Sequence, residues 1–214
     1  PRQELLTFKE MYRLIRVFTE LGVNKVRLTG GEPFVRKDFV DFLEMLSYND
    51  LLDAINITTN GALISHHIDR IEKLEKVKNI NLSIDSLKRD KFAKITRRDV
   101  FPEVYKTFEM LEKSSLSLKL NIVVQSGFNT EEIVDFVRLT KDKNVAVRFI
   151  EEMPFNGKGQ REMKENWTFQ RILNEIKTEF DVSEVQSEKS STSRNYAIDN
   201  HLGSVGIIPA FTRT

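Results

Sequence analysis

This 214-residue chain contains no cysteine. It also has no long apolar run and no large excess of positive or negative charge. Without cysteine the chain can form no disulfide, use no thiol nucleophile and offer no thiolate ligand to a metal. No apolar run is long enough to span a bilayer. The 33 basic and 32 acidic side chains nearly cancel, so no field of one sign attracts nucleic acid or an anionic membrane. We therefore expect a cytoplasmic protein that binds neither.

The apolar pattern alternates between strand and helix periods over residues 7–151. Helices are expected at about 7–21, 39–46, 65–76, 100–112 and after 129, and strands at about 25–29, 55–59, 79–85, 118–125 and 145–151. A capping box of Thr7 and Glu10 precedes the first helix, which Gly22 ends. Repeated strand–helix units predict an α/β fold with a parallel sheet, either doubly wound or curled toward a (β/α) barrel.

Each expected strand has a polar face and an apolar face. The polar residues are Asn56, Thr58 and Asn60, then Asn79, Asn81, Ser83 and Asp85, then Lys119, Asn121 and Gln125. A closed barrel normally fills its interior with branched apolar side chains, so a polar inner wall implies a large polar ligand. The alternative is an open sheet whose polar face is in water. The strand faces favour the ligand-lined barrel.

The pattern changes beyond residue 152. A polar segment at 154–165 precedes a helix patterned on residues 169–180, a linker at 187–194, and two short strands near 195–198 and 205–208 that flank a turn. We expect residues 1–155 to form an incomplete TIM-like (β/α) barrel, and residues 156–214 to begin a C-terminal extension. The chain starts at Pro1 rather than Met, which suggests a part of something longer.

The segment from Lys25 to Asp38 is a strand whose end is suited to binding a ligand. Gly30 and Gly31 let the backbone approach a bound molecule closely, because neither has a Cβ. Glu32 follows at once, beside the exposed peptide groups, and a proline stiffens the exit. An ordinary strand-to-helix turn is the alternative for a bare Gly-Gly pair.

Three cations, Arg27, Lys119 and Arg148, are expected to face inward from three strands. Because inward cations are costly unless paired, they predict an anionic ligand such as a phosphate or carboxylate. The alternative is internal pairing with Asp85 and Glu151. The cluster Lys94–Arg98 is interpreted as a solvated loop, and the three histidines lack the spacing of zinc ligands. Phosphate-loop, Rossmann and serine-elbow signatures are absent.

Six motifs in order along the chain carry a family resemblance. They are Val-Arg-Leu-Thr-Gly-Gly-Glu-Pro (26–33), Thr-Thr-Asn-Gly (58–61), Asn-Leu-Ser-Ile-Asp-Ser-Leu (81–87), Lys-Leu-Asn-Ile-Val-Val-Gln (119–125), Val-Arg-Phe-Ile-Glu (147–151) and Gly-Ile-Ile-Pro-Ala (206–210). Together they resemble the GTP 3′,8-cyclase family, radical S-adenosylmethionine (SAM) enzymes of molybdenum cofactor biosynthesis. Gly-Gly-Glu-Pro alone would indicate only the radical SAM superfamily.

The resemblance implies a set of ligand-binding residues. Gly30, Gly31 and Glu32 would bind the methionine end of SAM, Ser83 its carboxylate, and the backbone at Met153 its adenine. Arg27, Thr58 and Lys119 would face GTP, with Lys25 and Arg148 as weaker candidates. The resemblance also implies a radical SAM lyase that cyclises GTP to 3′,8-cyclo-7,8-dihydro-GTP, an electron donor as a partner, and a homodimer.

The family also uses two [4Fe–4S] clusters held by cysteine motifs, and this chain has neither motif. By the family pattern, the first barrel strand and one motif would precede Pro1, and the second motif would follow Thr214. We therefore expect a central fragment that is inactive by itself. The alternatives are a cluster-free nucleotide-binding or scaffold protein on the same barrel, and another radical SAM enzyme, such as one that modifies peptides.

Overall fold

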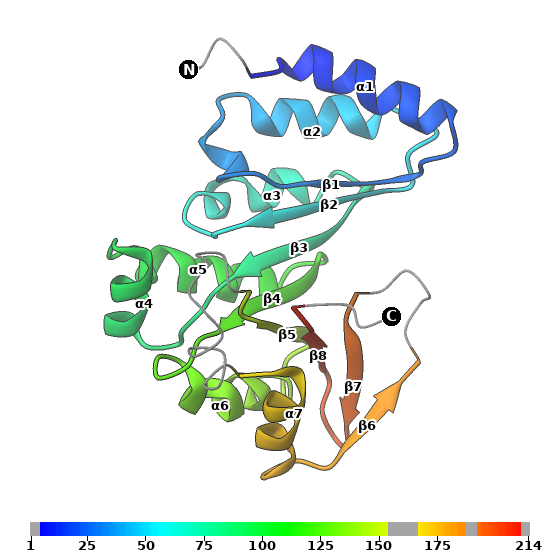
Figure 1. Cartoon of the computed structure of the whole chain (residues 1–214). Helices are drawn as coiled ribbons and strands as arrows, with labels where there is room; N and C mark the ends of the chain where they lie inside the picture. Colours follow the sequence, from blue (N-terminus) through cyan, green and yellow to red (C-terminus); the bar gives the residue numbers. More distant parts are fainter. Residues whose placement is uncertain (1–4, 154–166, 187–191, 211–214) are drawn as a thin grey trace. The chain divides into compact units, whose positions relative to one another are not determined.

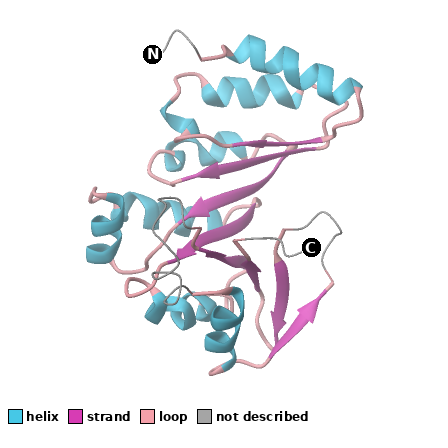
Figure 2. Ribbon diagram, viewed as in Figure 1, coloured by secondary structure: helices cyan, strands magenta, loops and turns pink. Residues whose placement is uncertain are grey.

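A computed structural model describes residues 5–153, 167–186 and 192–210 of the chain (Figure 1). Its contacts divide the chain into two compact units. The first comprises Pro1–Asn81 and Glu103–Ser117, and the second comprises Leu82–Pro102 and Leu118–Thr214. Strands alternate with helices along most of the described chain (Figure 2), which confirms the predicted α/β class.

The first unit is built on parallel strands with helices packed against them. Its elements are α1 (Phe8–Glu20), β1 (Lys25–Leu28), the 3-10 turn η2 (Pro33–Val35), α2 (Phe39–Ser47), β2 (Ala54–Thr59), the 3-10 turn η3 (Ile64–His67), α3 (Ile68–Ile71), most of β3 (Val77–Ser83) and most of α5 (Phe101–Glu112). The strand order is β1-β2-β3, and β1 pairs in parallel with β2 so that Val26 lies opposite Ile55.

Helix α1 begins as its sequence predicts, but Leu14, Phe18 and Leu21 of its expected apolar face are exposed. The Thr7 hydroxyl accepts from the Glu10 backbone N–H at 3.2 Å, and Glu10 accepts from the Thr7 N–H at 2.7 Å, which completes the capping box. Helices α1 and α2 lie side by side (Figure 1), and the rings of Phe8 and Phe42 stack with centroids 4.7 Å apart. Gly22 has φ 97°, a left-handed conformation that suits glycine after a helix.

The second unit contains a mixed sheet with the strand order β4-β5-β8-β7-β6. Its strands are β4 (Ser117–Val124), β5 (Val145–Glu151), β6 (Val182–Val185), β7 (Arg194–Ile198) and β8 (Ser204–Ile208). Its helices are α4 (Arg89–Thr96), η4 (Thr130–Glu132), α6 (Ile133–Arg138) and α7 (Phe169–Lys177). β5 pairs in parallel with β4 and with β8, whereas β7 runs antiparallel to β8 and β6. The strands β6, β7 and β8 therefore continue the sheet that β4 and β5 begin.

Three elements differ from the sequence prediction. The helix expected at 65–76 is a 3-10 turn followed by the short α3, which ends at Ile71. α4 was not expected, since its single fully buried side chain, Phe92, gives a weak apolar pattern. β6 was not expected either, because three of its four residues are exposed.

The two faces of the strands differ as predicted. In β2 the side chains of Ile55 and Ile57 are fully buried, whereas Asn56 and Thr58 are half-buried, and β4 shows the same alternation. β1 and β6 are the outer strands of the order, so the described strands do not close into a complete barrel. The fold is an incomplete TIM-like barrel, as the sequence predicts.

Candidate functional site

The carboxylate of Glu32 is fixed at the exit of β1 by three hydrogen bonds. Its Oε1 accepts from the Thr59 hydroxyl at 2.8 Å and from the Phe34 backbone N–H at 3.2 Å, and its Oε2 accepts from the Asn60 backbone N–H at 2.7 Å. Each oxygen of an ionised carboxylate has two acceptor sites, so Oε2 can accept a further bond. Glu32 thus joins the carboxyl ends of β1 and β2 and can still contact a ligand.

Gly30 and Gly31 leave the backbone beside Glu32 accessible. Both residues are exposed, and no atom lies within 4 Å of the position that a Cβ would take on either. Their peptide groups therefore face open space, where a ligand can reach them. The structure brings both glycines and Glu32 together at one strand end, as the sequence predicts.

The polar face of β1 and β2 contains two of the residues predicted to face GTP. Arg27 lies opposite Asn56 in the parallel register, so their side chains share a face, and Thr58 is two residues further along it. The Asn56 Oδ1 accepts from the Asn79 amide at 2.8 Å. Arg27 is exposed and Thr58 is half-buried. Lys25, a weaker candidate, is exposed on the same face of β1.

In the second unit, Asp85 follows Ser83 at the end of β3. The Asp85 Oδ1 accepts from the Val123 backbone N–H at 2.8 Å. Burial raises the pKa of Asp85 above its ordinary range, and the bond from Val123 opposes this only in part. Asn129 completes the junction, because its amide donates to the Asp85 and Val123 carbonyls at 2.8 and 2.9 Å. The partner that the structure gives the Asp85 carboxylate is therefore a backbone N–H, whereas the sequence suggested pairing with cations.

The segment after Asp85 is held by Glu132, whose side chain is fully buried. The Glu132 carboxylate accepts from the Ser86 hydroxyl at 2.9 and 3.0 Å and from the Leu87 backbone N–H at 2.8 Å. The ammonium of Lys91 lies 3.5 Å from it. The role of Glu132 was not predicted from the sequence, because a Glu in the polar run Asn-Thr-Glu-Glu is typical of an exposed position before a helix.

The polar face of β4 and β5 contains the other predicted cations. Lys119 lies opposite Ala146, and Asn121 lies opposite Arg148, so all four side chains share one face. Lys119 and Arg148 are both half-buried. The structure therefore places these two cations on the same face of neighbouring strands, as the sequence predicts.

At the end of β5, Glu151 is bound to backbone groups. Its Oε2 accepts from the Phe169 N–H at 3.2 Å and from the Ala210 N–H at 3.4 Å. It thereby links β5 to the start of α7 and to the residues after β8. Met153 follows two residues later and is 42% exposed.

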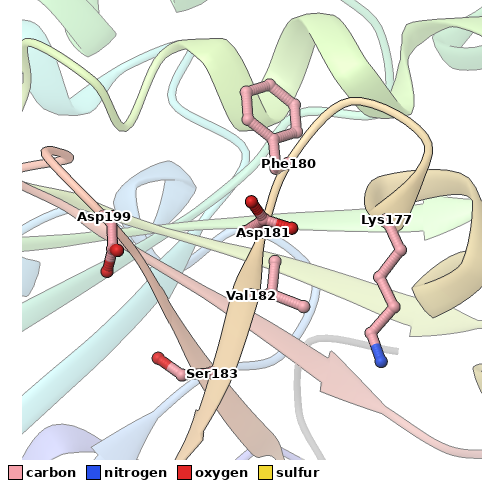
Figure 3. A pocket seen from close by; sticks show the side chains of 6 residues that line it. All are labelled: Lys177, Phe180, Asp181, Val182, Ser183 and Asp199. Atoms are coloured by element: carbon pink, nitrogen blue, oxygen red, sulfur yellow. The ribbon is translucent and has the colours of Figure 1, made fainter.

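A separate hollow of about 400 Å³ lies between the end of α7 and the strands β6 and β7 (Figure 3). It is lined by Lys177, Phe180, Asp181, Val182, Ser183 and Asp199. It includes none of the predicted site residues. Its two carboxylates and one ammonium lie at an open surface, and nothing in the structure favours a particular ligand there.

The remaining sequence predictions concern residues outside the site. Arg97 and Arg98 are exposed beyond the end of α4, consistent with a solvated loop. His67 stacks on Phe34, and the His201 Nδ1 lies 2.7 Å from the Thr140 hydroxyl, so both are packing residues. Among the described residues, no group of three or more His, Asp or Glu side chains could hold a metal, and none of the helices could cross a bilayer.

The chain is similar to proteins of molybdenum cofactor biosynthesis. It is 41% identical over 99% of its length to "Molybdenum cofactor biosynthesis protein moc-5" of Caenorhabditis elegans, of which it covers 35%. It is 37% identical over 99% of its length to "GTP 3',8-cyclase, mitochondrial" of Arabidopsis thaliana, covering 54% of it. With "GTP 3',8-cyclase" of Alkaliphilus oremlandii the identity is 36% over 96% of the chain and 63% of that protein. The chain thus spans about one to two thirds of these relatives.

Solved structures and a family model agree on the fold. Streptococcus suis SuiB superposes with a TM-score of 0.62 at 18% identity, over 81% of this chain and 40% of SuiB. Residues 1–140 match the model of the radical SAM superfamily. Since this match covers more than half of the 214 residues, the chain belongs to the radical SAM superfamily.

Proposed function

We propose that this chain supplies the SAM- and GTP-binding residues of a GTP 3′,8-cyclase, a radical SAM lyase of molybdenum cofactor biosynthesis. The observation that carries the proposal is the fixed Glu32 carboxylate beside two accessible glycine peptide groups. The names of the relatives from Arabidopsis thaliana and Alkaliphilus oremlandii support GTP as the substrate. A cytoplasmic location and a homodimer stay predictions, and the name of the Arabidopsis relative includes the word mitochondrial.

The residues proposed for SAM fit its chemistry. The methionine end of SAM has an ammonium group, and Glu32 and the Gly30 and Gly31 peptide groups offer acceptors for it. Ser83 would contact the carboxylate through its hydroxyl, and the backbone at Met153, an exposed residue, would meet the adenine. When bound, SAM supplies the adenosyl group for radical chemistry on the nucleotide.

GTP has three phosphates and needs cations near them. Lys119 and Arg148 share the polar face of β4 and β5, and Arg27 and Thr58 share that of β1 and β2. We infer that Lys119 and Arg148 hold the phosphates, which accelerates a reaction by positioning rather than by proton transfer. Arg27 and Thr58 are proposed as GTP-binding residues of the first unit. Lys25 is a weaker candidate for the same role.

The iron–sulfur clusters that the family uses do not fit any residues of this chain. Such clusters are held mainly by cysteine thiolates, and the chain contains no cysteine. The chain alone therefore offers SAM and GTP binding without cluster binding. The absence of cysteine also favours the second candidate function, that of a nucleotide-binding protein without redox chemistry.

The experiment uses the complete natural gene product, purified and reduced without oxygen. Incubation with SAM and GTP should yield 5′-deoxyadenosine and the cyclised nucleotide, both measured by mass spectrometry. Glu32→Gln should weaken SAM binding about tenfold while GTP binding stays the same, because Gln replaces a charged acceptor with a neutral one. Binding of GTP without any cleavage of SAM would instead support the nucleotide-binding protein.

A further inference from the structure

The side chain of Asn121 has a buried acceptor that the described part of the protein leaves unpaired. Asn121 lies in the middle of β4, and its Oδ1 is inaccessible to solvent and finds no donor among the described residues. Leaving a buried polar atom unpaired destabilises a fold, so most such atoms in proteins have a partner. A ligand that donates a hydrogen bond would remove this cost.

Other asparagines of the chain contrast with Asn121. The Asn129 amide donates to two backbone carbonyls, and its Oδ1 accepts from the Gln125 N–H at 2.8 Å. The Asn79 amide donates to Asn56, and the Asn49 amide donates to the Thr19 hydroxyl at 3.1 Å. These three residues support local structure, whereas the Oδ1 of Asn121 supports none of the described structure.

Asn121 belongs to a row of residues at one level of the second unit's sheet. Arg148 of β5 lies opposite Asn121, Gly206 of β8 lies opposite Arg148, and Asn195 of β7 lies opposite Gly206. A Cβ on Gly206 would lie 3.0 Å from the Asn195 Oδ1 and 3.4 Å from the Arg148 Cγ. Glycine at position 206 therefore leaves room for the Arg148 side chain beside Asn121.

The chemistry of the unpaired atom limits what it can bind. An amide oxygen only accepts hydrogen bonds, so its partner must carry an N–H or O–H group. The ionised triphosphate of GTP offers acceptors, which suit the cations Lys119 and Arg148. The ribose hydroxyls and the N–H groups of guanine are the donors of the nucleotide.

We propose that Asn121 is a ligand-binding residue that accepts a hydrogen bond from the nucleoside half of GTP. This inference rests on the proposed function and deepens it, because it divides the face of β4 and β5 into two parts. Lys119 and Arg148 bind the phosphates, and the Asn121 Oδ1 accepts a hydrogen bond from a donor group of the nucleoside. The orientation of the nucleotide is fixed by contacts at both of its ends.

The test measures ligand binding and thermal stability in the complete natural gene product. Asn121→Ala and Asn121→Leu should weaken GTP and guanosine binding about tenfold, the usual effect of losing one hydrogen bond in a site. The affinity for inorganic tripolyphosphate should stay within about twofold of the natural protein. The melting temperature should stay the same or rise, since the unpaired buried oxygen is removed.

Asn79→Ala is the matched control. It removes a strand asparagine whose amide already has a partner, so it should lower the melting temperature. Comparing guanosine triphosphate with its 2′-deoxy and inosine analogues in the Asn121→Ala protein then identifies the donor. The analogue that lacks the relevant group should show no further loss.

The outcomes separate the two proposals. A natural protein that does not bind GTP would refute the proposed function, and with it this inference. A natural protein that binds GTP, with Asn121 variants of unchanged GTP affinity, would refute only the inference. A lower melting temperature together with an equal loss of tripolyphosphate binding would identify Asn121 as a structural residue and would also overturn it.

Discussion

At the scale of single residues, the sharpest prediction concerns the charge of Lys119. Its half-buried side chain shares a face with Arg148, so Lys119→Glu would place a negative charge where the phosphates of GTP are proposed to bind. Two charges about 4 Å apart near a protein surface interact by about 4 kcal/mol, so GTP affinity should fall roughly 100-fold or more. SAM cleavage should persist. Calorimetric titration with each ligand measures both effects.

Lys78→Glu is the control for Lys119. Lys78 is an exposed lysine on β3, so its charge reversal should change GTP affinity by less than about twofold. A Lys119→Glu protein that keeps its melting temperature and still binds GTP as the natural protein does would contradict the assignment of Lys119 to the phosphates.

Asp85 gives a prediction about pH. Burial raises its pKa in the folded protein, so the charged form is disfavoured there. Such a group stabilises the fold below the ordinary pKa of aspartate, about 4, and this contribution is lost as the pH rises through the raised value. Asp85→Asn removes the charge and keeps an oxygen for the Val123 N–H, so it should stabilise the protein by about 1 kcal/mol at pH 7.

Thermal unfolding between pH 3.5 and 8 checks this, with the range chosen to span the ordinary and raised pKa values. The difference between Asp85→Asn and the natural protein should be smallest at the acidic end and should grow as the pH rises. A constant difference, or one that shrinks toward pH 7, would mean that Asp85 carries no raised pKa.

Residues whose role depends on the local backbone were predictable from the sequence. Residues whose role depends on a partner far away in the sequence were not. Gly30 and Gly31 lie at a strand end, where the lack of a Cβ leaves the backbone accessible. Glu132 contacts Ser86 and Leu87, which are more than 40 positions away in the sequence. No local pattern encodes such a pairing, so its role becomes visible only in the folded structure.

At the scale of elements, Glu132 is predicted to fix the segment that follows β3. Glu132→Ala would leave the Ser86 hydroxyl and the Leu87 N–H buried without their acceptor, which should destabilise the protein by about 2–4 kcal/mol. Urea unfolding measures this loss, and hydrogen exchange should accelerate at residues 86–88. Glu131→Ala is the control, since Glu131 is exposed and its pair with Lys91 contributes at most about 1 kcal/mol. Equal losses in both variants would refute a specific role for Glu132.

Strands were more predictable than short helices for a physical reason. In β2 and β4, apolar and polar side chains alternate along the sequence. The apolar ones are buried because one face of each strand is covered, as at Ile55, Ile57, Leu118 and Leu120. α4 buries little more than Phe92, and α3 lasts a single turn. Their stability comes from packing rather than from their own apolar pattern, so the sequence around them is ambiguous.

At the scale of the whole molecule, each of the two compact units carries some of the residues proposed to bind ligands. Gly30, Gly31, Glu32, Arg27 and Thr58 belong to the first, and Ser83, Lys119 and Met153 belong to the second. The alternation of strands and helices up to β5 was predictable, since apolar residues recur with strand and helix periods in turn. The way in which β6 to β8 continue the second unit's sheet was not, because β8 pairs with β5 from more than 50 residues away.

The last prediction concerns the chain of 214 residues by itself. Without cysteine it has no thiolate to hold an iron–sulfur cluster, so it should form neither 5′-deoxyadenosine nor cyclised GTP under reducing, oxygen-free conditions. The complete natural gene product, assayed in parallel, should form both, and circular dichroism should establish that the shorter chain is folded. Because the residues proposed to bind GTP are present in both proteins, a folded chain should still bind GTP. Product formed by the cysteine-free chain would refute the need for thiolate-held clusters and, with it, the assignment of this chain to two-cluster chemistry.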